Sequence, residues 1–192
     1  DIEVEETDKK AGEEDIRRIV TEESYINRLE SDIPNIQVDG PRFAHTSGVE
    51  LKKSLQIDFH TMSLPSASLA WHCPYILIYH SDDGKVGGKE YEEYALVKIN
   101  GECNADTEFA TNSFGMVKTD AFPGWETWKA ANKRGKECSF EIIRKNDKVM
   151  FHTENLGIII DDEIQIKSEH KSIYVAITGD QVALTDIRVK EL

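Results

Sequence analysis

The stretch from Trp125 to Val189 restricts the fold of this chain more than any other part of the sequence. A short segment with two tryptophans, 124–135, begins near a proline, ends near a glycine and predicts a helix. It is followed by closely spaced runs in which apolar residues alternate, as in strands with one buried face. The runs FEIIRK and KVMFHT flank Asn146-Asp147, which predicts a tight β-hairpin. The later runs NLGIII, IQIK, SIYVAIT and VALTDIRV predict further strands.

The first half of the chain shows the same period of two from Val38 onward. LKKSLQIDFHT places Leu55, Ile57 and Phe59 on one face. YILIYH is almost entirely apolar, as a central strand covered on both faces would be. YEEYALVKI follows a glycine-rich turn, and FATNSFGMV is a weaker strand. About ten short strands with turn signals between them predict an all-β fold, a jelly-roll-type antiparallel β-sandwich with one short interposed helix.

Two irregularities are expected near the end of the chain. In VALTDIRV, Leu184 is out of step with Ile187 and Val189, which predicts a β-bulge near Asp186. The acidic triplet at 161–163 is expected to form a solvated turn between the runs NLGIII and IQIK.

Residues 1–37 are expected to precede the sandwich, which would span 38–192. Residues 1–12 are acidic and aperiodic, which is typical of a disordered lead-in. Apolar residues at helical spacing over 13–32 predict an N-terminal amphipathic helix, ended by Pro34. Its apolar stripe either packs on the sandwich or pairs with a partner helix. The stripe consists of Ile16, Ile19, Val20, Ile26 and Leu29.

The charge balance restricts the partners that the chain can bind. The sequence has 36 acidic and 23 basic residues, a formal net charge of −13. Such a surface repels phosphate backbones and anionic lipids, which argues against nucleic-acid and membrane-surface binding. A carbohydrate or another neutral small ligand is compatible with it. No apolar run approaches the roughly 18–20 residues of a membrane span, so direct membrane insertion is not expected.

The three cysteines, Cys73, Cys103 and Cys138, form neither a CxxC pair nor a cluster with zinc spacing. Cys138 alternates in phase with Phe140 and Ile142 and is expected to face the core. One disulfide is compatible with the sequence, which does not decide the redox compartment.

Trp125 and Trp128 are three residues apart and are expected on one face of the predicted helix. An indole stacks well on the C–H face of a sugar ring, so the pair suggests a sugar platform. The alternative is that the pair covers the open end of the sandwich. The cap is favoured for Trp128, and Trp125 is open to either role.

Trp71 precedes the central strand and is either a core residue or part of a binding face. By strand order, His72, Tyr75, Tyr94 and Lys98 are expected nearby and could supply hydrogen bonds to a ligand. The histidines show no metal-ligand spacing, no GxSxG motif occurs, and nothing selects the two facing carboxylates of a glycosidase.

No cofactor is expected, although a structural calcium ion is considered. Asp186, at the predicted bulge, could bind it together with Asp58 from an early strand.

The region from about Thr46 to Val189 resembles β-sandwich domains of the carbohydrate-binding-module or concanavalin-like kind. Such domains occur in secreted glycoside hydrolases of gut and rumen bacteria and in extracellular regions of bacterial diguanylate cyclases. The resemblance implies a jelly-roll sandwich without catalysis. It is carried by AWHCPYILIY, EYEEYALVKING, the WETW helix, FEIIRKNDKVMFHT and IYVAITGDQVALTDIRV.

The leading hypothesis is therefore a non-catalytic, extracellular or cell-surface carbohydrate-binding module. Trp71 and Trp125 would stack on the sugar. The alternative is a ligand-sensing input domain of a bacterial membrane signalling protein such as a diguanylate cyclase, in which the helix 13–32 would transmit the signal. A sandwich-fold lyase or hydrolase is a third hypothesis.

Overall fold

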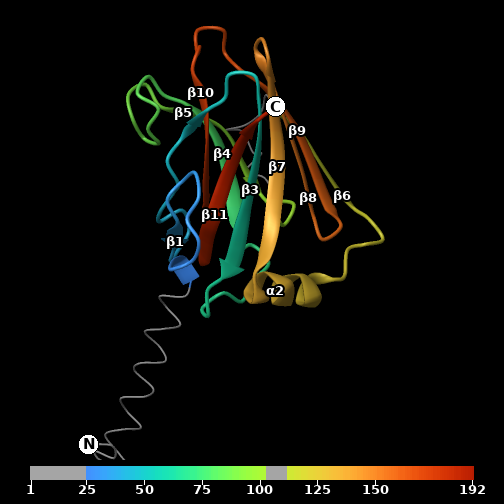
Figure 1. Ribbon diagram of the computed structural model, residues 1–192. Helices are drawn as coiled ribbons and strands as arrows, with labels where there is room; N and C mark the ends of the chain where they lie inside the picture. Colours follow the sequence, from blue (N-terminus) through green and yellow to red (C-terminus); the bar gives the residue numbers. More distant parts are fainter. Residues whose placement is uncertain (1–24, 103–111) are drawn as a thin grey trace, which may run out of the picture.

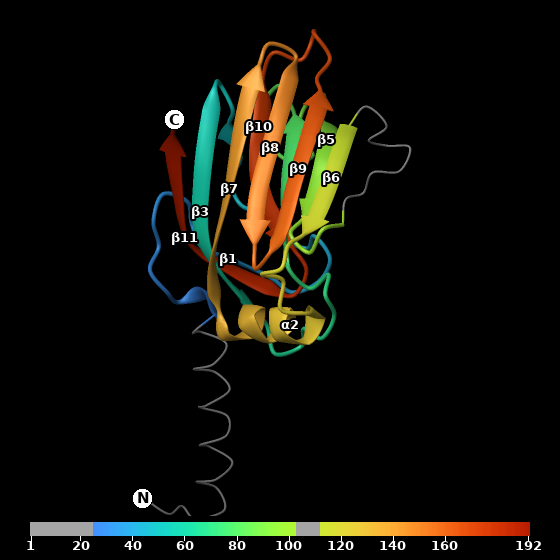
Figure 2. The same cartoon turned by 90° about the vertical axis from the view of Figure 1, so that its right-hand side faces the viewer.

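The predicted all-β sandwich is confirmed by the computed structural model, which describes residues 25–102 and 112–192. Two antiparallel sheets pack face to face, and one helix lies across an end of the pair (Figure 1). The larger sheet has seven strands in the order β1-β11-β3-β7-β8-β9-β6, and the smaller has four in the order β2-β10-β4-β5. Figure 2 shows the larger sheet in front of the smaller one. Non-consecutive neighbours in both sheets give the jelly-roll-like topology.

The elements have the following bounds. The seven-stranded sheet consists of β1 (Ile36–Val38), β11 (Val182–Glu191), β3 (Ser54–Ser63), β7 (Lys136–Lys145), β8 (Lys148–Asn155), β9 (Ile158–Gln165) and β6 (Asn112–Lys118). The four-stranded sheet consists of β2 (Val49–Glu50), β10 (Ile173–Gly179), β4 (Pro74–His80) and β5 (Glu92–Lys98). The helix α2 spans Trp125–Arg134.

The core follows from the alternation read in the sequence. Along β3, every second residue from Leu55 to Ser63 is buried and faces the smaller sheet. All seven residues of β4 are buried because β10 and β5 flank it and both of its faces are covered. The prediction of a covered central strand is therefore confirmed. Cys138 is also buried, as predicted, and both Cys73 and Cys138 carry free thiols.

The helix α2 closes one end of the sandwich (Figures 1 and 2). It begins after Gly124 and ends before Gly135, as predicted. Trp128 is fully buried, which confirms the preferred reading of this residue as a cap over the sandwich. Among the described residues, no helix is long and apolar enough to cross a membrane.

The predicted hairpin and bulge are both present. Lys145 pairs with Lys148 across the turn at Asn146-Asp147, and Asn146 has a left-handed φ of 55°. The register of β11 against β3 shifts between Thr185 and Arg188, around Asp186.

The predicted helix over 13–32 ends earlier than expected. Its residues 13–24 lie outside the described residues, and helical structure stops at Ile26. The side-chain amide of Asn35 donates hydrogen bonds to the backbone oxygens of Ile26 (3.0 Å) and Arg28 (3.1 Å). These bonds satisfy carbonyls that would otherwise continue the helix, so the predicted end at 32 was wrong.

The chain after Ile26 instead lies along β11. The Asp32 N–H donates to the Ile187 carbonyl at 2.9 Å, and Ile33 forms a bridge with Ile187. The stripe residues Ile26 and Leu29 are 42% and 68% exposed, so this end of the stripe does not pack into the sandwich. Because β1 begins at Ile36, sheet pairing starts before the expected boundary at residue 38.

The acidic triplet does not form a turn, which corrects the prediction for this segment. NLGIII and IQIK belong largely to one continuous strand, β9, and Asp161, Asp162 and Glu163 lie within it. Asp162 is in phase with Ile160 and Ile164, so it faces inward and is only 3% exposed.

Candidate functional site

A pocket of about 260 Å³ lies between α2 and the loop that joins β3 to β4. We call it the α2 pocket. Its volume is slightly below that of pockets for drug-sized ligands, so it suits one small ring. Its lining includes Leu69, His72, Trp128, Lys129, Asn132 and Lys133.

His72 holds the loop between β3 and β4, which forms one wall of the α2 pocket, in its conformation. Its Nδ1 accepts hydrogen bonds from the backbone N–H groups of Ser68 (2.9 Å) and Leu69 (3.1 Å). The ring hydrogen is therefore on Nε2, which lies 2.9 Å from the side-chain amide of Gln181 and 4.0 Å from Asp180. Turning the Gln181 amide so that its oxygen faces the ring satisfies this contact, at the expense of the 3.3 Å hydrogen bond from Gln181 Nε2 to Asp180 Oδ1. Since the protein engages both ring nitrogens, His72 orients the wall.

Trp71 is the neighbour of His72 and does not itself line the α2 pocket. The two rings meet edge-on with centroids 6.2 Å apart, and Trp71 is 42% exposed. The Tyr75 hydroxyl donates a 2.6 Å hydrogen bond to the Trp71 backbone oxygen. The backbone of Trp71 is thus held in place while part of its indole faces solvent.

Tyr75 contacts the backbone of Trp71, and Lys98 contacts the ring of Tyr75. Tyr75 is 3% exposed, and its burial raises the pKa of the phenol. The Lys98 ammonium lies 5.0 Å from the centre of the Tyr75 ring. The structure therefore joins four of the six predicted site residues, Trp71, His72, Tyr75 and Lys98, through direct contacts.

Trp125 does not line the α2 pocket, but it packs against Trp128, which does. Its ring packs edge-on against Trp128 at 5.5 Å and against Phe122 at 5.0 Å. The Lys118 ammonium lies 4.9 Å from the Trp125 ring centre. These contacts anchor α2 to the segment that precedes it, and Trp125 is half-buried.

Tyr94 is not part of this group. Its hydroxyl contacts His170 Nδ1 and accepts the Lys167 backbone N–H at 3.1 Å. Both residues belong to the connection between β9 and β10, which lies at the end of the sandwich opposite α2 (Figure 1). Burial raises the pKa of Tyr94.

Two polar side-chain atoms of α2 residues that line the pocket have no hydrogen-bond partner among the described residues. Trp128 is 0% exposed and Asn132 is 1% exposed. Within the described part of the chain, neither Trp128 Nε1 nor Asn132 Oδ1 has a hydrogen-bond partner. Asn132 Nδ2 donates to the Trp128 backbone oxygen at 2.9 Å, which fixes the amide. The helix side of the pocket therefore holds one unused donor and one unused acceptor, both buried.

Two lysines tie the loop to the helix around the pocket. Lys129 Nζ donates to the Ser68 carbonyl at 3.3 Å and also pairs with Glu126 at 2.9 Å. Lys133 Nζ lies 3.5 Å from the Pro65 carbonyl oxygen. Lys129 is therefore paired with a carboxylate, whereas Lys133 has only this long contact with a neutral carbonyl and keeps its charge beside the pocket.

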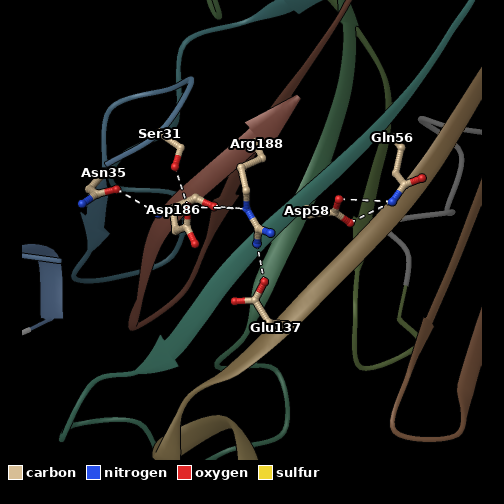
Figure 3. Close-up of polar contacts among 7 residues, drawn as sticks. All are labelled: Ser31, Asn35, Gln56, Asp58, Glu137, Asp186 and Arg188. Atoms are coloured by element: carbon tan, nitrogen blue, oxygen red, sulfur yellow. Dashed lines mark hydrogen bonds and ion pairs between the residues drawn. The ribbon is translucent and has the colours of Figure 1, made fainter. Parts of the chain in front are cut away.

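The two calcium candidates lie on the larger sheet around Arg188 (Figure 3). Asp186 accepts a hydrogen bond from Ser31 and lies 3.5 Å from Arg188 Nε, and Arg188 also pairs with Glu137. Asp58 is paired with Arg188 in the strand register. Arg188 already supplies positive charge beside both carboxylates. Among residues 25–102 and 112–192, no group of three or more His, Cys, Asp or Glu could hold a metal ion.

The sequence reading missed Asn132 and the loop residue Leu69. Asn132 follows Trp128 by four residues, so helical spacing places both on one face. That spacing was the available signal, but it does not reveal which loop faces the helix.

No protein-family model matches this chain. No curated protein sequence matches it either.

Several solved structures are distantly similar to this chain. One is the carbohydrate-binding module CBM66 from Bacillus subtilis, with TM-score 0.40, 10% identity and coverage of 82% of this chain and 86% of that chain. Another is a double mutant of congerin II, with TM-score 0.36, 10% identity and coverage of 83% and 100%. A third is the Ca²⁺-bound exoplasmic/lumenal domain of VIP36, with TM-score 0.39, 10% identity and coverage of 88% of each chain. At these scores none of them assigns this chain to a family.

Proposed function

We propose that this domain is a non-catalytic module that binds a carbohydrate, or a similar neutral polyhydroxyl ligand, at the α2 pocket. The observation that carries the proposal is the partly exposed indole of Trp71, which packs edge-on against His72, a residue that lines the α2 pocket together with Trp128 and Asn132. Trp71 offers an apolar face for a sugar ring, and the pocket wall offers hydrogen bonds.

The pocket chemistry supports binding without turnover. Glycoside hydrolysis ordinarily needs two carboxyl groups facing each other across the bond. Glu126 is the sole carboxylate among the residues that line the α2 pocket, and it pairs with Lys129.

Binding of soluble glycans, measured by tryptophan fluorescence and by calorimetry, tests this function. A saturable response without cleavage products is expected. Trp71→Ala should weaken binding at least about tenfold, since stacked aromatic rings are common centres of binding energy. Phe43→Ala is the matched control because Phe43 is 73% exposed and does not line the pocket. Equal binding by both variants and the wild type would rule out this site.

The proposal includes an extracellular or cell-surface location, where polysaccharides are encountered. Surface labelling of cells that produce the full-length protein tests it. Purely cytoplasmic protein would contradict this part of the proposal.

One observation favours the alternative, a sensing input domain of a membrane signalling protein. Gln181, which contacts His72, immediately precedes β11, and Asn35 accepts a 3.1 Å hydrogen bond from the Asp186 backbone N–H on that strand. One strand therefore joins the pocket wall to the segment that follows the N-terminal helix. Hydrogen exchange with and without a binding glycan distinguishes the two functions, because a sensor should change protection around Asn35 and a simple binding module should not.

A further inference from the structure

We propose that Trp128 and Asn132 together recognise one hydroxyl group of the ligand in the α2 pocket. This inference rests on the proposed function, because it specifies the chemistry that the same pocket selects. It assigns the ligand contact to two helix residues rather than to the loop residue His72, whose ring nitrogens are already engaged by the protein.

The two side chains lie one helical turn apart and both line the pocket. Trp128 Nε1 is a donor that has no acceptor, and Asn132 Oδ1 is an acceptor that has no donor, within the described residues. Buried polar atoms in folded proteins nearly always have partners, since leaving one unsatisfied is costly. Both residues line one pocket and both atoms are themselves buried, so a single small group can satisfy both only by penetrating to the bottom of the pocket.

The orientation of the amide makes the pair selective. The hydrogen bond from Asn132 Nδ2 to the Trp128 carbonyl holds the amide so that its oxygen is the unused atom. The wall therefore requires a group that accepts from an indole N–H and donates to a carbonyl oxygen. A hydroxyl does both.

Other common ligand groups satisfy at most half of this requirement. An ether or ketone oxygen accepts but cannot donate, and an ammonium group donates but cannot accept. A carboxylate would place negative charge against the Asn132 oxygen. A site built to bind a hydroxyl discriminates strongly against analogues that lack it, because its polar atoms are then left unpaired. A water molecule meets the same requirement and would compete with the ligand hydroxyl for these two atoms.

The test follows the indole N–H signals of the whole chain by ¹H–¹⁵N NMR. The three tryptophans give three indole signals, which single Trp→Phe variants assign. The probes are glycerol, its trimethyl ether, and the methyl glycosides of glucose, galactose and mannose. We expect glycerol and at least one glycoside to shift the Trp128 signal saturably, and the trimethyl ether to leave it unchanged.

Trp128→Phe removes the donor and keeps an aromatic ring, and Trp125→Phe makes the same change at a neighbouring position as a control. We expect Trp128→Phe to bind the active glycoside at least about tenfold more weakly, and Trp125→Phe to bind it within about threefold of the wild type. Asn132→Leu removes the acceptor at similar volume and provides a second variant if Trp128→Phe does not fold.

The outcomes separate this inference from the proposed function. If a glycoside binds but the Trp128 signal does not move, or Trp128→Phe binds as well as the wild type, hydroxyl recognition by this pair is refuted while the binding function stands. If glycerol shifts the Trp128 signal but no carbohydrate binds, hydroxyl recognition stands and the carbohydrate function falls. If no probe shifts any indole signal, both are refuted.

Discussion

Replacing Asp162 by asparagine is expected to stabilise the domain at neutral pH. The Asp162 carboxyl faces the interior from β9, and its Oδ1 has no hydrogen-bond partner in the described part of the chain. Its Oδ2 lies 3.4 Å from Asn112 Nδ2, a weak contact for a buried charge. Burial raises the pKa of Asp162 from 3.8 to about 6. An amide of the same shape carries no charge and avoids this cost.

The sign and size of the effect follow from linkage. The folded chain holds the Asp162 proton more tightly than the unfolded chain, so this group favours folding most in acid. Its contribution is lost as the pH rises through the window from about 4 to about 6. A shift of about two units at 1.36 kcal/mol per unit gives a penalty of at most about 3 kcal/mol above that window.

Urea denaturation followed by tryptophan fluorescence measures the difference between wild type and Asp162→Asn. We expect Asp162→Asn to be more stable by about 2–3 kcal/mol near pH 7.5, and by less than about 1 kcal/mol near pH 4. Glu154→Gln, which removes an exposed carboxylate from neighbouring β8, should stay within about 0.5 kcal/mol of wild type at both pH values. A difference that does not change with pH, or none near pH 7.5, would refute the reasoning.

Three further predictions concern stability, each measured by urea denaturation. Trp128→Ala should cost about 3–5 kcal/mol because the side chain is fully buried, whereas Trp71→Ala, at 42% exposure, should cost less than about 1 kcal/mol. Gly157→Ala should cost at least about 1–3 kcal/mol, because φ is 83° and the added Cβ would lie 2.2 Å from a backbone nitrogen. Asn35→Ala should cost about 1–2 kcal/mol through loss of its bonds to Ile26 and to the Asp186 N–H. Losses below about 0.5 kcal/mol for Trp128→Ala, Gly157→Ala or Asn35→Ala would contradict the contacts described.

The strands could be predicted wherever one face is buried and the other is solvated. The inward residues of β3 and the turn at Asn146-Asp147 both carry strong local signals, period two and a left-handed turn residue. The bulge at Asp186 was visible because it breaks that period. In these cases local preference and tertiary packing agree.

The buried carboxyl of Asp162 could not be recognised from local composition. Three consecutive acidic residues normally indicate a solvated turn, and the alternation through Ile160 and Ile164 was the weaker signal. The end of the N-terminal helix was missed for a related reason. Pro34 is a local stop signal, whereas the actual end depends on Asn35 and on contacts with β11, which is distant in sequence.

The loop side of the candidate site could be predicted from the sequence, whereas its contact with α2 could not. Trp71 and His72 are adjacent in the loop before β4, and Tyr75 follows at the start of that strand, so their association is local. The meeting of this loop with α2 depends on how the chain closes the end of the sandwich, about sixty residues later in the sequence. Strand order alone also placed Tyr94 near the others, although its hydroxyl belongs to the opposite end of the sandwich.

The segment from Leu29 to Val38 also protects the domain against self-association. The Asp186 N–H donates to the Leu29 carbonyl, the Val189 N–H to the Asp32 carboxylate, and β1 pairs with the start of β11. Without this cover, β11 would be a long strand with an open edge, the kind of surface that recruits a second chain. A shortened chain starting at Asp39 should therefore form oligomers or aggregates even if its sandwich still folds, whereas one starting at Tyr25 should stay monodisperse.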